Sequence, residues 1–273
     1  MSGAESSYIH GTAPEEQARL SSMNDLINRS SLRELALREG ERVLDVGAGL
    51  CQLTRAMARA TRRPVVGLER SAEQIAEARR QAQAAGEAGL LDLRQGEATA
   101  LPLAAGERGA FDVAHARFLL EHVRTPDSVV AAMARAVRPG GRVVIADDDH
   151  DQLRLWPEPA YFETVWRAYA RSYDRNGCDP IVGRRLVQLL AGAGLRPRRI
   201  GVLPFGACAG QAEFGPLVRN IAVIFEGARE AILGTGGATA AGFEAALTAL
   251  EAFGRRDDAA IWYGAPWAEG VRP

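Results

Sequence analysis

The chain has 273 residues, of which 47% are hydrophobic and 25% charged, and its formal net charge is −1. These proportions are ordinary for a globular protein that is large enough to bury a sizeable core as one domain or two. The near-neutral charge argues against a protein that holds nucleic acid or an acidic membrane by electrostatic attraction. All 33 basic residues are arginine, a bias that we attribute to a GC-rich genome.

The three cysteines indicate a reducing compartment. Cys51, Cys178 and Cys208 are odd in number, far apart and in no C-x-x-C spacing, so we expect free thiols and neither a disulfide framework nor a zinc site. No apolar run is long enough to span a bilayer, and no signal peptide is visible at the N-terminus. The expected localisation is therefore cytoplasmic.

The first forty residues are predicted to be helical. Pro14 to Gln17 begin a helix well, with Thr12 as a candidate N-cap. Apolar residues then recur at helical spacing, and a second helix is expected to end at Gly40. We expect residues 1–40 to form an N-terminal helical lid.

Strands and helices alternate over residues 41–150. The expected strands are 42–46, 64–68, 90–94, 111–116 and 141–147, and the expected helices are 51–60, 71–85 and 126–137. Such alternation predicts a parallel sheet covered by helices on both faces, with ligands bound at the carboxyl ends of the strands.

The pattern changes over residues 151–273. Helices are expected at 159–175, 181–193, 211–233 and 239–254, and strands at 196–203 and 260–263. We expect this part to supply the remaining core strands together with helical lid insertions around a substrate site. Fourteen aromatic residues lie in this part, which favours an aromatic-lined pocket for a planar or hydrophobic small molecule.

A glycine-rich loop points to a nucleoside cofactor. An apolar stretch ends in Asp45, Gly47 and Gly49, and Glu69 closes a second apolar run 20 residues further on. Glycines let the backbone approach a ligand, and an acid at the end of the second strand accepts hydrogen bonds from ribose hydroxyls. The third glycine of a dinucleotide fingerprint is replaced by Gln52. Asp45 would repel a pyrophosphate but suits the ammonium group of an amino-acid ligand.

These residues resemble motif I of the class I S-adenosylmethionine (SAM) methyltransferases, D/E-x-G-x-G-x-G, except that Cys51 stands at the last glycine. A small thiol is tolerated there if the local backbone is helical. Other segments resemble later elements of the same family, in the family's order, and the closest likeness is to the methyltransferases of quinone biosynthesis and related natural-product enzymes. The matching segments are Gly96-Glu97-Ala98, Leu101-Pro102, Phe111 to Ala116 and Pro139 to Ile145.

The resemblance implies an α/β fold with a Rossmann-like, mostly parallel seven-stranded sheet, and it makes residues 41–150 the SAM-binding core. It implies that Glu69 binds the ribose, Glu97 and Ala98 the adenine, and the glycine loop the methionine part of SAM. A phenol in the N-terminal lid could bond the methionine carboxylate. The implied cofactor-binding residues are Tyr8, Asp45, Gly47, Ala48, Gly49, Glu69, Arg70, Gln74, Glu97, Ala98 and Arg117.

Candidates for acid–base chemistry follow the fourth and fifth predicted strands. His122 resembles a histidine that often follows motif IV in this family, with a structural role equally open. The run from Asp147 to Asp151 offers Asp149 and His150 as groups that face the acceptor, or else as caps of the following helix. Tyr8 and His10 are further candidates in the lid, or packing residues. We expect no metal, because adjacent residues on a strand point to opposite faces and cannot converge without a sharp turn.

The sequence therefore predicts a SAM-dependent methyltransferase that acts on a small organic molecule, in secondary or quinone-like metabolism. Whether carbon, nitrogen or oxygen is methylated stays open, as does a homodimer. We expect a small-molecule acceptor as the partner and neither nucleic acid nor a membrane. The alternatives are an RNA methyltransferase, a SAM-binding protein without catalysis and, last, a nicotinamide oxidoreductase.

Overall fold

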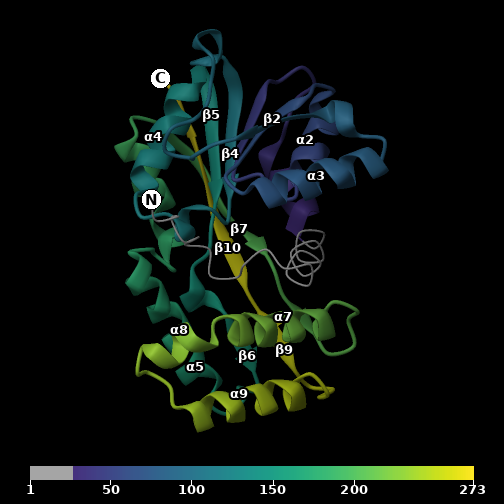
Figure 1. Ribbon diagram of the computed structural model, residues 1–273, viewed down its shortest axis with the longest axis vertical. Coiled ribbons are helices and arrows are strands. Elements are labelled where there is room, and N and C mark those ends of the chain that lie inside the picture. Colours follow the sequence, from purple (N-terminus) through teal and green to yellow (C-terminus); the bar gives the residue numbers. More distant parts are fainter. Residues whose placement is uncertain (1–26) are drawn as a thin grey trace.

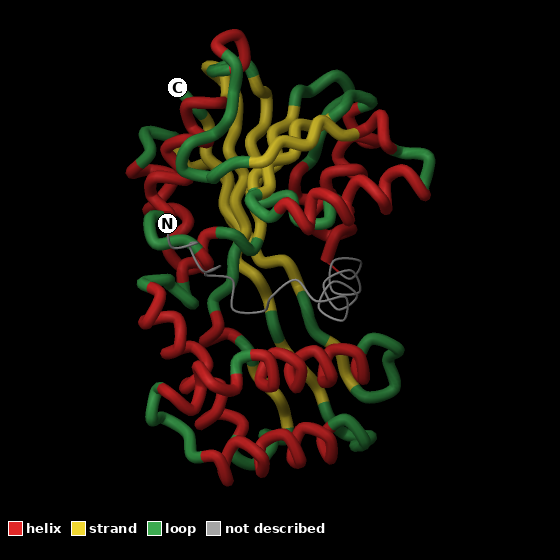
Figure 2. Tube along the Cα trace, in the orientation of Figure 1, coloured by secondary structure: helices red, strands yellow, loops and turns green. Residues whose placement is uncertain are grey.

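The computed structural model describes residues 27–273 (Figures 1 and 2). Its main sheet has the strand order β3-β2-β1-β4-β5-β10-β7, in which β10 runs antiparallel to both of its neighbours and the other pairs described are parallel. This mostly parallel seven-stranded sheet confirms the predicted fold class. The strands are β1 (Val43–Val46), β2 (Val65–Glu69), β3 (Leu91–Gln95), β4 (Phe111–Arg117), β5 (Val137–Ala146), β7 (Arg196–Pro204) and β10 (Gly264–Val271).

Helices cover both faces of this sheet because successive strand residues point to opposite sides. Val43 and Val144 pack with Met57 of α2 and with the helical residues 27–35 on one face. Leu44 and Val143 pack with α4 and α6 on the other face. The helices of this lobe are α2 (Gln52–Thr61), α3 (Ala72–Ala84), α4 (Pro126–Ala136) and α6 (Leu186–Gly192).

A second lobe lies beyond the carboxyl ends of the parallel strands (Figure 1). Its small antiparallel sheet has the order β6-β9-β8, and four helices pack against it around a core of aromatic and aliphatic side chains. The elements are β6 (Arg154–Trp156), β8 (Ala207–Cys208), β9 (Ala260–Trp262), α5 (Phe162–Ser172), α7 (Phe214–Gly227), α8 (Arg229–Gly234) and α9 (Ala240–Phe253).

Short 3-10 turns join many of these elements, namely η1 (Ala88–Leu90), η2 (Ala105–Glu107), η3 (Leu120–His122), η4 (His150–Gln152), η5 (Tyr173–Asn176) and η6 (Val182–Arg185). Two of these turns, η3 and η4, carry residues of the candidate site. Within residues 27–273, no helix is long and apolar enough to cross a membrane.

Several predicted boundaries were wrong. The seventh strand of the main sheet is β10 over residues 264–271, whereas the predicted strand 260–263 became β9 of the small sheet. The sequence of β10 hid it, because Gly264, Pro266 and Gly270 are poor strand formers and only the neighbouring strands stabilise them in this conformation. The predicted helix 211–233 is two helices, α7 and α8. The helix expected to end at Gly40 ends at residue 35.

The division of the chain at residues 40 and 150 stays a prediction. The main sheet draws five strands from residues 43–146 and two from beyond residue 195, so neither lobe is one continuous segment.

One buried carboxylate in β10 pairs with arginines of both neighbouring strands, β5 and β7. Glu269 of β10 is fully buried, and its oxygens lie 2.6 Å from Nε of Arg198 and 2.7 Å from a terminal nitrogen of Arg199. A third guanidinium, that of Arg142, lies 3.4 Å away and also donates to the backbone oxygen of Leu35. Burial opposes ionisation of Glu269, but these arginines outweigh it and lower its pKa.

We therefore expect Glu269→Gln to lower the free energy of unfolding by about 3 kcal/mol, the lower end for a broken buried ion pair, because Arg198 is half-exposed. Urea unfolding measures the change. Glu39→Gln is the control, since its exposed pair with Arg62 should contribute less than about 1 kcal/mol. Equal losses in the two variants would contradict this account of Glu269.

Candidate functional site

A cavity of about 230 Å³ lies at the carboxyl ends of β1, β2 and β4. The strand order reverses between β1 and β4, and ligands of open α/β sheets bind at such a switch point. All ten predicted cofactor-binding residues that fall within residues 27–273 line this cavity. They are Asp45, Gly47, Ala48, Gly49, Glu69, Arg70, Gln74, Glu97, Ala98 and Arg117.

The glycine loop owes its shape to three residues with positive φ. Gly47 has φ +75°, and a Cβ on it would come within 3.1 Å of Leu119. Gly49 has φ +54°, and Cys51 has φ 59°. Cys51 therefore lacks the helical backbone that would make a thiol easily tolerated there, and it takes the left-handed conformation in which a glycine is least strained. The buried thiol stands where motif I has glycine.

Glu69 joins the loop to the turn after β2. One carboxylate oxygen accepts the N–H of Gly49 at 3.0 Å, and the other accepts the N–H groups of Arg70 and Ser71 at 2.8 and 2.9 Å. The N–H groups of Gly47 and Ala48 donate to the backbone oxygen of Leu68, both at 2.9 Å. The end of β2 thus holds the loop and fixes the direction of its acid.

Asp45 and Arg117 form the polar floor of the cavity. The buried Asp45 carboxylate accepts from the hydroxyl of Thr54 at 2.6 Å and lies 2.8 Å from Nδ1 of His115. Arg117 donates to the side chains of Ser31 and Asn28 at 2.7 and 2.8 Å. Burial lowers the pKa of Arg117 to about 10, and Asp45 partly offsets the shift, so the guanidinium stays charged at neutral pH.

A turn after β4 carries the next groups, and Asp147 holds it. The Asp147 carboxylate is fully buried and accepts the N–H groups of Leu119, Leu120 and Glu121 at 3.0, 2.7 and 3.3 Å. These hydrogen bonds fix the conformation of η3 and place His122 in the wall of the cavity.

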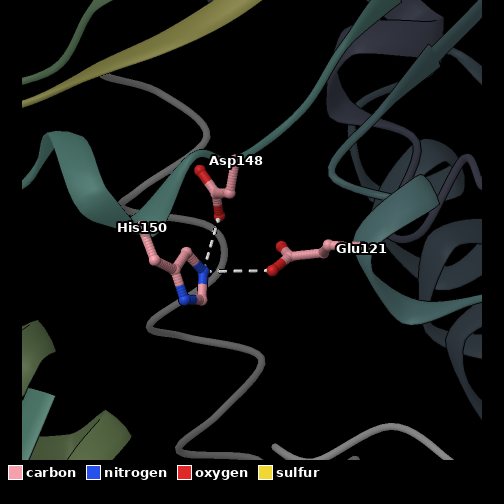
Figure 3. A group of neighbouring side chains, drawn as sticks. All are labelled: Glu121, Asp148 and His150. Carbon is pink, nitrogen blue, oxygen red and sulfur yellow. Dashed lines mark ion pairs between the residues drawn. The ribbon is translucent and has the colours of Figure 1, made fainter. Parts of the chain in front are cut away.

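Glu121, Asp148 and His150 converge beside the cavity wall (Figure 3). Nε2 of His150 lies 3.1 Å from Oε2 of Glu121 and 3.7 Å from Oδ2 of Asp148. The hydroxyl of Tyr263 donates to the other oxygen of Asp148. The indole N–H of Trp166 donates to the backbone oxygen of His150 at 2.8 Å.

Burial and mutual charge set the protonation of this cluster. Desolvation, reinforced by Asp148, raises the pKa of Glu121 to about 7. Desolvation opposes the charged form of His150, but the carboxylates of Asp148 and Glu121 outweigh it and raise its pKa to about 10. Desolvation lowers the pKa of His122 to about 4, so this imidazole is neutral at pH 7.

The structure separates the predicted acid–base residues. His122 lines the cavity, whereas His150 lies behind it in the buried cluster. Asp149 pairs with Arg184, with 3.0 Å between Nε and Oδ2, and it caps the turn η4. Its role toward the acceptor stays a prediction. Tyr8 and His10 lie outside the described residues, and their roles also stay predictions.

The expectation of no metal rested on a straight strand through Asp147 to Asp151, which the structure does not have. The strand β5 ends at Ala146, and the turn that follows places Asp148 and His150 beside Glu121. With Glu121 they offer three ligand atoms within 4.8 Å of one another, a spacing that could hold a metal ion. The atom that His150 turns toward the carboxylates is the nitrogen that would bind such an ion.

Sequence reasoning missed Glu121 and Tyr263. Glu121 directly precedes the candidate His122, and this position was its only signal. Tyr263 comes from the end of the chain, 115 residues from Asp148, and no local pattern links the two.

Comparison with known proteins agrees with this geometry. Residues 44–145 match the methyltransferase domain family. The ubiquinone biosynthesis O-methyltransferase of Cronobacter sakazakii is 42% identical over 104 residues, which is 38% of this chain and 41% of that protein. The chain spans less than half the length of the curated relatives it matches.

Solved structures share the fold. Geranyl diphosphate C-methyltransferase from Streptomyces coelicolor A3(2) has a TM-score of 0.56 at 12% identity, covering 99% of this chain and 88% of its own. The 4+2 cyclase SpnF has a TM-score of 0.56 at 22% identity, covering 96% of this chain and 84% of its own. The family predicted from the motifs is confirmed: the chain contains a methyltransferase domain of the class I, SAM-dependent type over residues 44–145.

The loop geometry makes a prediction about thiol reactivity. Burial raises the pKa of Cys51 to about 12, and Asp45 reinforces the shift, so at pH 8 only about one molecule in 10,000 carries the reactive thiolate. Cys208 is exposed. We expect a disulfide-forming reagent to modify Cys208 quickly and Cys51 only after unfolding in urea, as followed by mass spectrometry of peptides. Rapid modification of Cys51 in the folded protein would contradict the buried, closed loop.

Proposed function

We propose that the protein transfers a methyl group from SAM to a small organic acceptor in secondary metabolism. The observation that carries the proposal is the cavity at the switch point of the sheet, which is lined by all ten described residues that the motifs assign to SAM. When bound, SAM supplies a methyl group on a positively charged sulfur, and the group leaves by in-line displacement. The chain's own contribution is to hold the cofactor, orient the acceptor and move a proton.

Each part of SAM has a complementary group in this cavity. Asp45 offers its buried carboxylate to the ammonium group, while Arg117 offers its charge to the methionine carboxylate. Glu69, already oriented by backbone N–H groups, accepts from the ribose hydroxyls. Glu97 and Ala98 border the adenine end. Positioning and exclusion of water then supply much of the catalysis.

The acceptor is proposed to bind between the cavity and the second lobe. Tyr173 packs against the ring of His122, with their centroids 6.1 Å apart, and Tyr169 stacks on His150 at 5.4 Å. His122 is the proposed base for the acceptor's proton, since it lines the cavity and is neutral at pH 7.

The alternatives have weaker support. A net charge of −1 gives no electrostatic attraction to RNA, so an RNA methyltransferase is disfavoured. A nicotinamide oxidoreductase would place a pyrophosphate beside the buried Asp45 carboxylate. A SAM-binding protein without catalysis differs only in turnover, and the second experiment below separates it.

The first experiment is calorimetric titration with SAM, S-adenosylhomocysteine and NAD. We expect the first two to bind and NAD not to bind. Glu69→Ala should weaken SAM binding 10- to 100-fold, because a charged hydrogen-bond acceptor contributes about 1.5–3 kcal/mol. The control is Glu163→Ala, which removes an exposed pair with Arg167 on the other lobe and should leave affinity unchanged. Binding of NAD alone would reject the proposed cofactor.

The second experiment measures release of S-adenosylhomocysteine from SAM with catechol, phenol and aniline as probes of oxygen and nitrogen acceptors. We expect turnover with at least one of them. His122→Ala should lower its rate about 100-fold while SAM affinity stays within twofold, because a positioned base contributes at this level. Tight SAM binding without release of product for any probe would instead favour the non-catalytic alternative.

A further inference from the structure

Asp45 and His115 face each other at the switch point of the main sheet. The register of β1 and β4 pairs these two residues, so their side chains project from the same face of the sheet and both line the cavity. Nδ1 of His115 lies 2.8 Å from Oδ1 of Asp45, and both side chains are almost wholly buried. Because a carboxylate accepts hydrogen bonds, Nδ1 is the nitrogen that donates.

A third element, the helix α2, holds the other oxygen of the same carboxylate. Thr54 is fully buried in the first turn of α2, and its hydroxyl donates to Oδ2 of Asp45 at 2.6 Å. Each carboxylate oxygen can accept two hydrogen bonds, so both oxygens keep a further position for a donor. Asp45 is thus fixed at both oxygens while it can still accept from a ligand.

The opposite charge in the cavity, that of Arg117, is held by different partners. Ser31 and Asn28 accept from its two terminal nitrogens at 2.7 and 2.8 Å. Burial lowers the pKa of Arg117, and the charge of Asp45 acts in the opposite direction, so the two charged groups are near enough to interact. Separate sets of hydrogen bonds therefore hold a carboxylate and a guanidinium in one cavity.

These hydrogen bonds keep the two charges available to a ligand. Opposite charges attract each other strongly where water is scarce, and a carboxylate turned onto the guanidinium would leave neither charge for a bound molecule. Rotation of Asp45 toward Arg117 would break the hydrogen bonds from His115 and Thr54 and leave buried donors unpaired, which is costly. The cavity therefore presents one negative and one positive group, which together are complementary to a zwitterion.

We propose that His115 and Thr54 are positioning residues, which hold Asp45 toward the cavity and thereby make it selective for adenosyl ligands that carry an amino-acid zwitterion. This inference rests on the proposed function, in which Asp45 receives the ammonium group of SAM and Arg117 receives the carboxylate. His115 and Thr54 act on the ligand through Asp45, whose two oxygens they orient.

The first test compares three ligands of the wild-type protein by calorimetry. S-adenosylhomocysteine carries both charges of the zwitterion, its deamino analogue carries only the carboxylate, and 5′-methylthioadenosine carries neither. We expect the deamino analogue to bind about 10- to 100-fold more weakly than S-adenosylhomocysteine, because it loses a charged hydrogen bond. Equal affinity of these two ligands would overturn the proposal, since Asp45 would then not receive the ammonium group.

The second test removes each hydrogen bond to Asp45 in turn. In His115→Leu and in Thr54→Val we expect S-adenosylhomocysteine to bind about 10-fold more weakly or worse. The affinity for 5′-methylthioadenosine should stay within about twofold of the wild type, because this ligand has no group for Asp45. The matched controls are His115→Asn, whose amide N–H replaces that of Nδ1, and Thr54→Ser, which keeps the hydroxyl. Both should retain the selectivity of the wild type.

5′-Methylthioadenosine separates positioning from a merely structural role. Weaker binding of all three ligands by the same factor in His115→Leu, or unchanged binding of all three, would overturn the proposal. If His115→Leu does not fold, the comparison of Thr54→Val with Thr54→Ser decides in the same way. Failure of the wild type to bind S-adenosylhomocysteine would instead reject the proposed function, so the two failures are distinguishable.

Discussion

The carboxylate of Asp147 is the constraint on which the rest of the site depends. It stands directly after β5 and accepts three successive N–H groups of the turn that follows β4. Because β4 and β5 are neighbours, these hydrogen bonds fix the position at which the turn after β4 leaves the sheet. In this position Leu119 packs against Gly47, and His122 lies in the cavity wall. One fully buried acid thus positions both the cofactor loop and the proposed base.

The same turn explains why a cluster of buried acids is tolerated. An unpaired carboxylate in a protein interior costs several kcal/mol unless hydrogen bonds or charges compensate it. Backbone donors offset only part of this cost for Asp147, since burial and the neighbouring Glu121 raise its pKa. Burial also opposes ionisation of Asp148, but His150 and Tyr263 outweigh it and lower its pKa. Burial, reinforced by Asp148, raises the pKa of Glu121.

The cluster exists only because the two lobes meet. Tyr263 lies between β9 of the small sheet and β10 of the main sheet, and its backbone oxygen accepts the N–H of Phe205 at 2.8 Å. The two strands around it therefore run as one ribbon from lobe to lobe (Figure 2). Trp166 of the second lobe holds the backbone of His150. The second lobe thus takes part directly in setting the protonation of the site.

The sequence by itself determined the class of fold and the cofactor side of the cavity. Local patterns suffice there, because Asp45, the glycines and Glu69 follow strands whose alternation dictates a parallel sheet with its ligand site at one edge. The sequence did not determine the seventh strand, whose glycines and proline suit a strand only between two neighbours. Nor could it show that Glu121, His150 and Tyr263 meet. The hydrogen bond from Tyr263 to Asp148 joins segments 115 residues apart, and only the packing of the two lobes brings these side chains together.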